Sequence, residues 1–320
     1  MGFLNLRQPL NGSSEDLISV IIPTRDRPVQ LLRALKSVLS QTHRPVEIIV
    51  VDDGSQEPTA QLLTQHFGQD VICCRNETPA GAAVARNVGL RVATGHFVAF
   101  LDDDDTWLPN KLSSQFDEME RSLEKPSMVG CGFSYVYEGH EVAIRDYFPS
   151  HNFYEKLLTQ NFIGGCSVPL IRTEALRRIG GFDEGFPSCQ DWELWLRLAR
   201  IGPVGFVPAS LVRREIHGDQ ITADVRRKIS GREMLLAKFQ TDLKAHPRAL
   251  GEHMRRLGTL CLLNEDNIKA RKYYRNALDC LGFDWSAIIG VLISWWPTLV
   301  AQSVARKFAA SKIGHITFYH

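Results

Sequence analysis

The sequence predicts an α/β domain with a mostly parallel central sheet flanked by helices, followed by a helical C-terminal region. Short β-branched runs alternate with amphipathic helical runs through the first half of the chain, and the short runs are apolar on both faces. Such strands are typical of parallel sheets that helices cover on both sides. Beyond about residue 225 helical patterns dominate. We expect an N-terminal extension over 1–16, the α/β domain over 17–224 and a helical region over 225–320.

The predicted elements follow one another regularly. Ile18–Ile22 is a β-branched run that we expect to end at Pro23, and Pro28 suits the first turn of a helix. The further predicted strands are Val46–Val51, Val71–Cys74, Phe97–Leu101, Met128–Tyr137 and Ser167–Arg172, and the helices lie near Pro58–Phe67, Ala82–Ala93 and Asp191–Ala199. In a parallel sheet the ligand crevice lies outside the carboxyl ends of the strands. The polar clusters Pro23–Arg27, Asp52–Ser55 and Asp102–Asp105 fall at those ends.

The composition is that of a globular protein, with 44% hydrophobic and 23% charged residues. The net charge of +1 conceals an asymmetry, because residues 225–320 hold 16 Lys and Arg against 7 Asp and Glu. The acidic remainder argues against a nucleic-acid partner, whereas the basic region suits anionic lipid or an anionic protein. None of the seven cysteines has CxxC spacing and no signal peptide is visible, so we expect reduced thiols and a cytoplasmic protein.

The strongest local signal is the run Asp102–Asp105 directly after the apolar strand Phe97–Leu101. Adjacent carboxylates repel one another by about 1 kcal/mol per close pair even in water. A helix N-terminus would need only one of them as a cap. A divalent cation removes the repulsion, and oxygen ligands without a His or Cys pattern suit Mg²⁺ or Mn²⁺. The run therefore predicts a metal or donor-binding site.

Four weaker signals each leave an alternative open. Asp53, in Asp52–Ser55, is followed by Gly54. An Asp-Gly pair after a strand is typical of an ordinary turn, so Asp53 is either functional or part of such a turn. Ala80–Asn87 opens a helix with small residues, which suits either a phosphate or close helix packing. Asp191 at a predicted helix start is either a general base or a plain N-cap. His217 is either a ligand or an ordinary surface histidine.

The ordered set ISVIIPTRDR, SVLSQT, EIIVVDDGS, ARNVGL, ATGHFVAFLDDDD, GGFDE, QDWELWLRL and RREIHGDQIT resembles family 2 of the inverting glycosyltransferases, over residues 17–220. The resemblance implies the type A nucleotide-sugar fold and a metal-dependent hexosyltransferase. Its donor would be a nucleoside diphosphate sugar, with UDP as the nucleotide expected by default. Its acceptor would be a glycan or a lipid-linked sugar. The expected pathway is cell-surface polysaccharide or glycoconjugate synthesis. The QxxRW pattern of processive synthases is absent, which favours single-sugar transfer.

The resemblance also implies roles for individual positions. Pro23, Thr24 and Arg25 would contact the nucleotide, although many members have an aromatic residue where Arg25 stands. The other implied donor-binding residues are Asp53 at the base, Asp103 at the ribose, and Gly81, Arg86 and Asp102 near the nucleotide.

The resemblance assigns the reaction to three further residues. Asp104 would be the metal ligand of a DxD-like pair with Asp102, and His217 would approach the diphosphate and its metal. Asp191 would be the catalytic base. Many members have Glu where Gln190 stands, so Asp191 is the only carboxylate of that pair.

The C-terminal region carries two further features. Ala270–Leu278 resembles the second helix of a tetratricopeptide repeat, with Leu257–Leu263 as its first, which predicts a helical hairpin. Residues 285–305 hold three tryptophans, Pro297 and no charge. This segment is interpreted as an interfacial membrane contact, as core or homodimer-forming helices, or as a transmembrane helix. Membrane contact would be peripheral, at the inner face of the cell membrane.

Two other functions compete with a glycosyltransferase. A sugar nucleotidyltransferase would carry a glycine-rich loop with arginine after the first strand, but Pro23–Arg27 contains no glycine. A catalytically inactive nucleotide-sugar-binding module would not need Asp53, Asp104 and Asp191, all of which are present.

Overall fold

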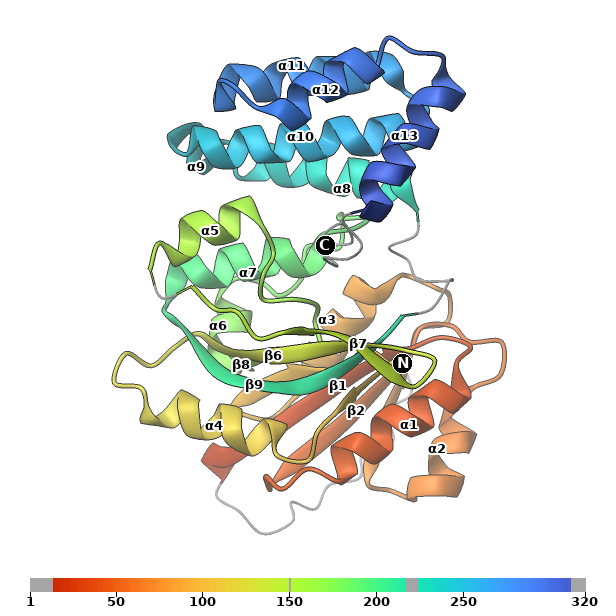
Figure 1. Ribbon diagram of the computed structural model, residues 1–320. Coiled ribbons are helices and arrows are strands. Elements are labelled where there is room, and N and C mark those ends of the chain that lie inside the picture. Colours follow the sequence, from red (N-terminus) through yellow and green to blue (C-terminus); the bar gives the residue numbers. More distant parts are fainter. Residues whose placement is uncertain (1–13, 150, 217–223, 312–320) are drawn as a thin grey trace. The chain divides into compact units, whose positions relative to one another are not determined.

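The computed structural model describes residues 14–149, 151–216 and 224–311 (Figure 1). The chain divides into two compact units. The α/β unit comprises 1–148, 163–184 and 194–217, and the helical unit comprises 149–162, 185–193 and 218–320. Two short segments from within the first 193 residues therefore group with the C-terminal helices.

The α/β unit is built on a nine-stranded sheet of order β3-β2-β1-β4-β8-β6-β9-β5, with β7 paired to β6. The strands are β1 (Ile18–Thr24), β2 (Val46–Asp52), β3 (Val71–Arg75), β4 (Phe97–Phe100), β5 (Asp105–Trp107), β6 (Met128–Tyr137), β7 (His140–Arg145), β8 (Leu170–Arg172) and β9 (Val204–Glu215). Strands β3, β2, β1 and β4 are parallel, β8 runs antiparallel to β4 and β6, and β6 and β9 are parallel. The predicted α/β fold class is confirmed, with a sheet that becomes mixed beyond β4.

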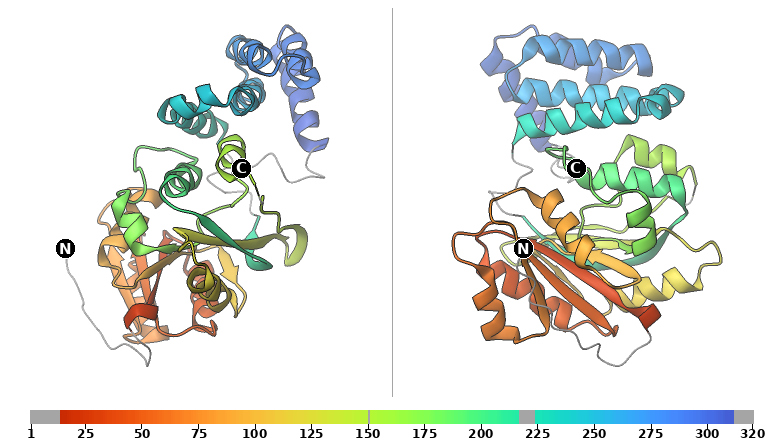
Figure 2. Two further views of the ribbon diagram at one scale, coloured as in Figure 1. Left: turned by 90° about the vertical axis from the view of Figure 1, so that its left-hand side faces the viewer. Right: turned by 180° about the vertical axis from the view of Figure 1, so that it is seen from behind.

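Helices cover this sheet. They are α1 (Pro28–Leu39), α2 (Thr59–Phe67), α3 (Ala82–Val92), α4 (Lys111–Arg121) and α6 (Thr173–Arg178), preceded by the 3₁₀ turn η1 (Ser14–Asp16). Right-handed crossovers place α1 and α2 on one face of the parallel strands and α3 on the other (Figures 1 and 2). Helix α3 packs closely against β1 at Gly89. A Cβ added there would lie 2.4 Å from Cγ2 of Ile21, which only the absence of a side chain avoids. This packing fixes the N-terminal end of α3 beside the strand ends.

The register of the parallel strands aligns their polar carboxyl ends. Thr24 pairs with Asp52, and Ile21 pairs with Phe100. Contrary to expectation, β1 continues through Pro23. The Thr24 carbonyl accepts from Asp53 N on the β2 side, and the Ile21 carbonyl accepts from Leu101 N on the β4 side. Backbone groups of successive residues point to alternate sides of a strand, so Pro23 faces the β4 side. Because β4 has already ended at this level, the missing N–H of Pro23 removes no hydrogen bond of the sheet.

The helical unit contains α5 (Phe153–Thr159), the first turn of α7 (Gln190–Ile201), α8 (Val225–Lys238), α9 (Gln240–Ala245), α10 (Pro247–Leu263), α11 (Asn267–Leu281), α12 (Trp285–Ile293) and α13 (Thr298–Ser311). Helices α10 and α11 form the hairpin expected from the sequence. Tyr274 lies at its centre, where a Cβ at Gly258 or Gly290 would come within 2.9 or 2.4 Å of the ring. These glycines allow α10, α11 and α12 to pack around one aromatic side chain.

The uncharged segment 285–305 folds as helix α12 and the first part of α13, which are separated by Ser294–Pro297. Within the described residues, no helix is both long enough and apolar enough to traverse a lipid bilayer. Ala287, Ile293 and Ala301 belong to the core of the helical unit. Large apolar side chains that are exposed in the described part of this segment include Trp285, Leu292, Trp295, Trp296 and Val300.

Candidate functional site

Asp53 at the end of β2 organises the loop that leads into α3. Its Oδ1 accepts hydrogen bonds from Asn76 Nδ2 at 2.8 Å and Ala80 N at 3.0 Å, and its Oδ2 accepts from Gly81 N at 2.8 Å. Asp53 as a whole is 6% exposed. Gly81 has a φ of +97°, which favours glycine. The predicted donor-binding residues Asp53 and Gly81 are thus in direct contact.

The aspartate run at the end of β4 contacts the ends of β1 and α3. Thr24 Oγ1 donates to Asp103 Oδ2 at 2.8 Å. Arg86 Nη2 donates to Asp102 Oδ1 at 2.5 Å. The fold therefore joins four of the predicted donor-binding residues, Thr24, Arg86, Asp102 and Asp103, through two hydrogen bonds.

Arg27 completes this carboxylate cluster. Its Nη1 donates to Asp103 Oδ1 at 3.3 Å and to Asp104 Oδ2 at 3.0 Å. Burial opposes the charge of Arg27, but Asp103 and Asp104 outweigh it and raise the pKa of Arg27. Sequence reasoning did not single out this residue, although it lies in the polar cluster that follows β1.

Each carboxylate of the Asp102–Asp105 run has an arginine partner, which the sequence did not predict. Asp102 pairs with Arg86, Asp103 and Asp104 pair with Arg27, and Asp105 lies with its Oδ2 3.6 Å from Arg214 Nε. Burial raises the pKa of Asp103 to about 6, and burial also raises that of Asp105. Arginines distant in the sequence therefore offset much of the expected repulsion.

Asp52 and Asn87 have structural roles beside the cluster. Asp52 accepts from Ser55 N, Thr59 N and Arg75 Nη1, so it fixes the turn into α2. Burial would raise the pKa of Asp52, but the hydrogen bonds from Thr59 and Ser55 outweigh it and lower the pKa. Asn87 exchanges hydrogen bonds with both backbone groups of Phe182. It therefore ties the 181–184 segment to α3.

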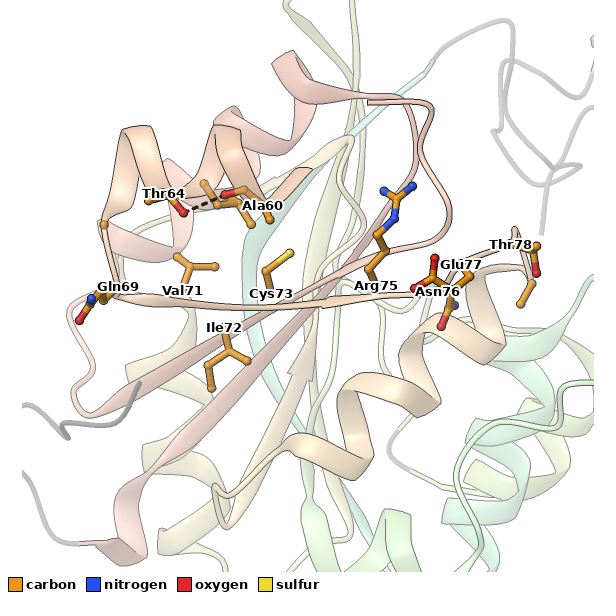
Figure 3. Close-up of a pocket in the computed structure, with 13 residues that line it drawn as sticks. Ala60, Thr64, Gln69, Val71, Ile72, Cys73, Arg75, Asn76, Glu77 and Thr78 are labelled. Carbon is orange, nitrogen blue, oxygen red and sulfur yellow. Dashed lines mark hydrogen bonds between the residues drawn. The ribbon is translucent and has the colours of Figure 1, made fainter. Parts of the chain in front are cut away.

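A pocket of about 790 Å³ lies beside the Asp53 loop, at the edge strand β3 (Figure 3). Strand β3 points Val71, Cys73 and Arg75 to one side and Ile72 to the other. Arg75 and Asn76 line the pocket and contact Asp52 and Asp53. Neither Arg75 nor Asn76 was among the residues predicted from the sequence, because their partners lie on another strand.

Arg25 does not join these contacts in the described part of the chain. It forms an ion pair with its neighbour Asp26, at 3.5 Å, and its side chain is 55% exposed. His217 lies outside the described residues. No group of three or more His, Cys, Asp or Glu side chains in the described part of the chain is arranged to hold a metal ion by itself.

Asp191 lies in the first turn of α7, in the helical unit. Because the helix begins at Gln190, Asp191 is not its N-cap residue. Its Oδ1 accepts from Trp192 N at 2.8 Å, and its Oδ2 accepts from Asn161 Nδ2 at 3.3 Å. Cys189, just before the helix, has a φ of +60°. This left-handed residue turns the chain into the helix start that carries Asp191.

An α/β sheet with clustered aspartates and arginines at the carboxyl ends of its parallel strands defines a class of protein that binds nucleotides or related ligands at this edge. This chain belongs to glycosyl transferase family 2, whose family model matches residues 19–180. The predicted glycosyltransferase function is thereby confirmed.

Known relatives agree with this assignment. The chain is 30% identical over 233 residues to an uncharacterised glycosyltransferase of Rickettsia typhi, with 70% of this chain and 71% of that protein covered. It is also 30% identical over 242 residues to the UDP-Glc:α-D-GlcNAc-diphosphoundecaprenol β-1,3-glucosyltransferase WfaP of Escherichia coli, with 73% and 90% covered.

Solved structures share the fold. S. aureus TarS 1–349 in complex with UDP-GlcNAc superposes with a TM-score of 0.57 at 17% identity, covering 91% of each chain. The mannosyltransferase PcManGT of Pyrobaculum calidifontis, in complex with GDP-Man and Mn²⁺, gives a TM-score of 0.56 at 17% identity, covering 92% of this chain and 86% of that one. At these identities the likeness concerns the fold alone.

Proposed function

We propose that this glycosyltransferase moves a hexose from a UDP-sugar to a hydroxyl group of a glycan or lipid-linked acceptor, with inversion at the anomeric carbon. The observation that carries the proposal is the cluster of Thr24, Asp53 and Asp102–Asp104 at one edge of the sheet. WfaP is named for UDP-Glc and for a diphosphoundecaprenol acceptor, and TarS binds UDP-GlcNAc. We therefore infer a role in cell-surface polysaccharide or glycoconjugate synthesis.

The nucleotide would lie against the ends of β1 and β2. Pro23 and Thr24 would line the base, and Asp103 would meet the ribose. Asp53 Oδ2 accepts one backbone hydrogen bond, from Gly81. A carboxylate oxygen accepts two, so Asp53 would also accept one from the base. Arg86, Gly81 and Arg25 would stand near the diphosphate and the nucleotide.

The residues at the end of β4 fit Mn²⁺ or Mg²⁺. Asp102 pairs with Arg86, whereas Asp103 and Asp104 both pair with Arg27, so three carboxylates lie beside these two guanidiniums. A diphosphate would add negative charge to this surface, and a divalent cation would offset it. Mg²⁺ needs only one or two protein carboxylates when phosphates supply further ligands, so no preformed three-residue cluster is required. Asp104, with Asp102 and His217, would hold the cation, which would neutralise the leaving diphosphate.

The chain's own residues would carry the remaining steps. Arg86 and Arg27 would add positive charge next to the diphosphate as its negative charge develops. Asp191 would accept the proton of the acceptor hydroxyl during its attack on the anomeric carbon, from the face opposite the leaving group. Asn161 holds Oδ2 of Asp191 and limits its rotation. Binding both substrates in fixed positions supplies much of the further rate acceleration.

We further propose peripheral contact with an anionic membrane through segment 285–305. Trp295 is 64% and Trp285 66% exposed, and Arg271 lies 3.4 Å from the centroid of the Trp295 ring. Exposed Lys272 and Arg275 follow Arg271 on the same helix. Tryptophan favours the headgroup region, and each basic residue near anionic lipid contributes about 1 kcal/mol. Such contact would bring the enzyme to a lipid-linked acceptor.

The test of the transfer mechanism is Asp191→Asn. This substitution should lower turnover by about a hundredfold or more, the scale of a lost general base, while UDP affinity stays close to that of the wild type. Turnover is measured with saturating acceptor and UDP affinity by calorimetry. Wild-type turnover in Asp191→Asn would exclude Asp191 as the base.

A further inference from the structure

Three helices of the helical unit converge on Trp192, the residue next to the proposed base. Its indole Nε1 donates to the carbonyl of Leu157 in α5 at 2.7 Å. The His253 ring, from α10, is stacked on the indole with centroids 5.1 Å apart and an interplanar angle of 21°. The Arg232 guanidinium, from α8, lies 5.0 Å from the ring centroid. Trp192 is 1% exposed, so these contacts hold it on several sides.

The hydrogen bonds of His253 define its tautomer. Nε2 is 2.7 Å from the Leu158 carbonyl, which can only accept, so Nε2 carries the proton. Nδ1 is therefore the acceptor for Arg232 Nη1 at 3.0 Å. Burial, reinforced by Arg232, lowers the pKa of His253 well below its usual value, so the ring stays neutral. Arg232 and His253 thus form one orienting pair against Trp192.

Neighbouring contacts fix the rest of this helix start. The fully buried Glu193 accepts from Lys238 Nζ at 2.7 Å. Ser188 Oγ donates to the carbonyl of Arg227 in α8 at 2.9 Å. A Cβ at Gly231 would lie 2.3 Å from Ser188 Oγ, so α8 approaches this segment as closely as a glycine allows. The residues on both sides of Asp191 are therefore held by α8.

We propose that Arg232 and His253 are positioning residues that hold the Asp191 carboxylate in its productive orientation through Trp192. This inference rests on the proposed role of Asp191 as the base. Helices α8 and α10 then serve catalysis by positioning the base. The link between Trp192 and the carboxylate is the Trp192 backbone N–H, which donates to Asp191 Oδ1 at 2.8 Å. A shift of about 1 Å in a reacting group costs about a hundredfold in rate.

The test uses Arg232→Met and His253→Gln, alone and in the Asp191→Asn background. Tyr273→Phe is the matched control, because it removes one hydrogen bond, to Glu233, in the same unit and does not touch Trp192. UDP binding by calorimetry reports the folded fraction and donor affinity. We expect turnover per UDP-binding site to fall about ten- to hundredfold in Arg232→Met and His253→Gln, with unchanged UDP affinity and an unaffected control.

The double variants separate positioning from general stability. If Arg232 acts through Asp191, Arg232→Met should change the residual turnover of Asp191→Asn by less than about twofold, because the two changes remove one function. If the loss of turnover in the double variant equals the product of the two single losses, the positioning inference is wrong. Wild-type turnover in Arg232→Met and His253→Gln would also overturn it. Neither result affects the assignment of Asp191 as the base. Wild-type turnover in Asp191→Asn overturns the base assignment and this inference with it.

Discussion

Asp53→Asn tests how the donor side of the site is organised. In the structure the carboxylate receives three hydrogen bonds from the loop that opens α3, two on Oδ1 and one on Oδ2. Asparagine keeps the shape but loses the charge, and its amide nitrogen would face one N–H donor without accepting from it. We expect the loop from Asn76 to Gly81 to loosen and the nucleotide to bind more weakly.

The size of the effect follows from these contacts. Hydrogen bonds to a charged group contribute about 1.5–3 kcal/mol each, against about 1 kcal/mol for neutral ones. Ala80 and Gly81 are exposed, so water can satisfy an N–H that loses its acceptor, and the penalty for an unpaired group is small. A net loss of about 2–3 kcal/mol is expected, which corresponds to about 30- to 150-fold weaker UDP binding.

Two measurements check this expectation. Calorimetry gives the UDP affinity, and hydrogen exchange gives the protection of the Ala80 and Gly81 amides. Asp70→Asn is the control, since Asp70 is an exposed acid in the same unit. Unchanged affinity and unchanged protection would refute the reasoning. Weaker binding with unchanged protection would assign Asp53 to direct base contact and not to loop order.

Two further predictions concern the cation and the membrane. UDP should bind at least about tenfold more tightly with Mn²⁺ than in EDTA, and Asp104→Asn should abolish the difference; equal affinity in wild type would contradict metal use. The protein should float with anionic vesicles and less with neutral ones, and the double variant Trp295→Ser with Trp296→Ser should not float. The control is Leu123→Ser, which changes another exposed apolar residue and should float like the wild type. If the double variant floats as well as this control, the proposed membrane face is wrong.

The first four strands could be predicted because their signal is local. β-Branched runs define β1 to β4 to within about two residues, since burial on both faces leaves few polar positions. In the mixed half of the sheet, β6 coincides with the predicted strand Met128–Tyr137, and β8 lies within the predicted strand Ser167–Arg172. Strand β5 was not predicted because its three residues are too few for a periodic pattern. The antiparallel pairing of β5 and β8 depends on distant segments and leaves no local signal.

The site was predictable to a similar extent. Aspartates at strand ends are visible in the sequence, and the structure brings Asp102, Asp103 and Thr24 together. The arginines that neutralise them were not recognised as partners. Arg27 is 76 positions from Asp103, and only the parallel pairing of β1 with β4 brings the two together. A charge pair of that separation leaves no local pattern to recognise.

The two roles proposed for the helical unit are carried by different helices, so point substitutions can separate them. The exposed tryptophans belong to α12 and the turn before α13, whereas the contacts to Trp192 come from α5, α8 and α10. Deleting residues beyond Asp284 would affect both membrane contact and the positioning of Trp192. The reason is that Gln302 Nε2 donates to the Leu263 carbonyl at the end of α10. Losing that support would disturb the helix that carries His253. Surface substitutions at Trp295 and Trp296 should therefore abolish vesicle binding while turnover on a water-soluble acceptor stays unchanged, and a loss of that turnover would show that the two functions are not separable.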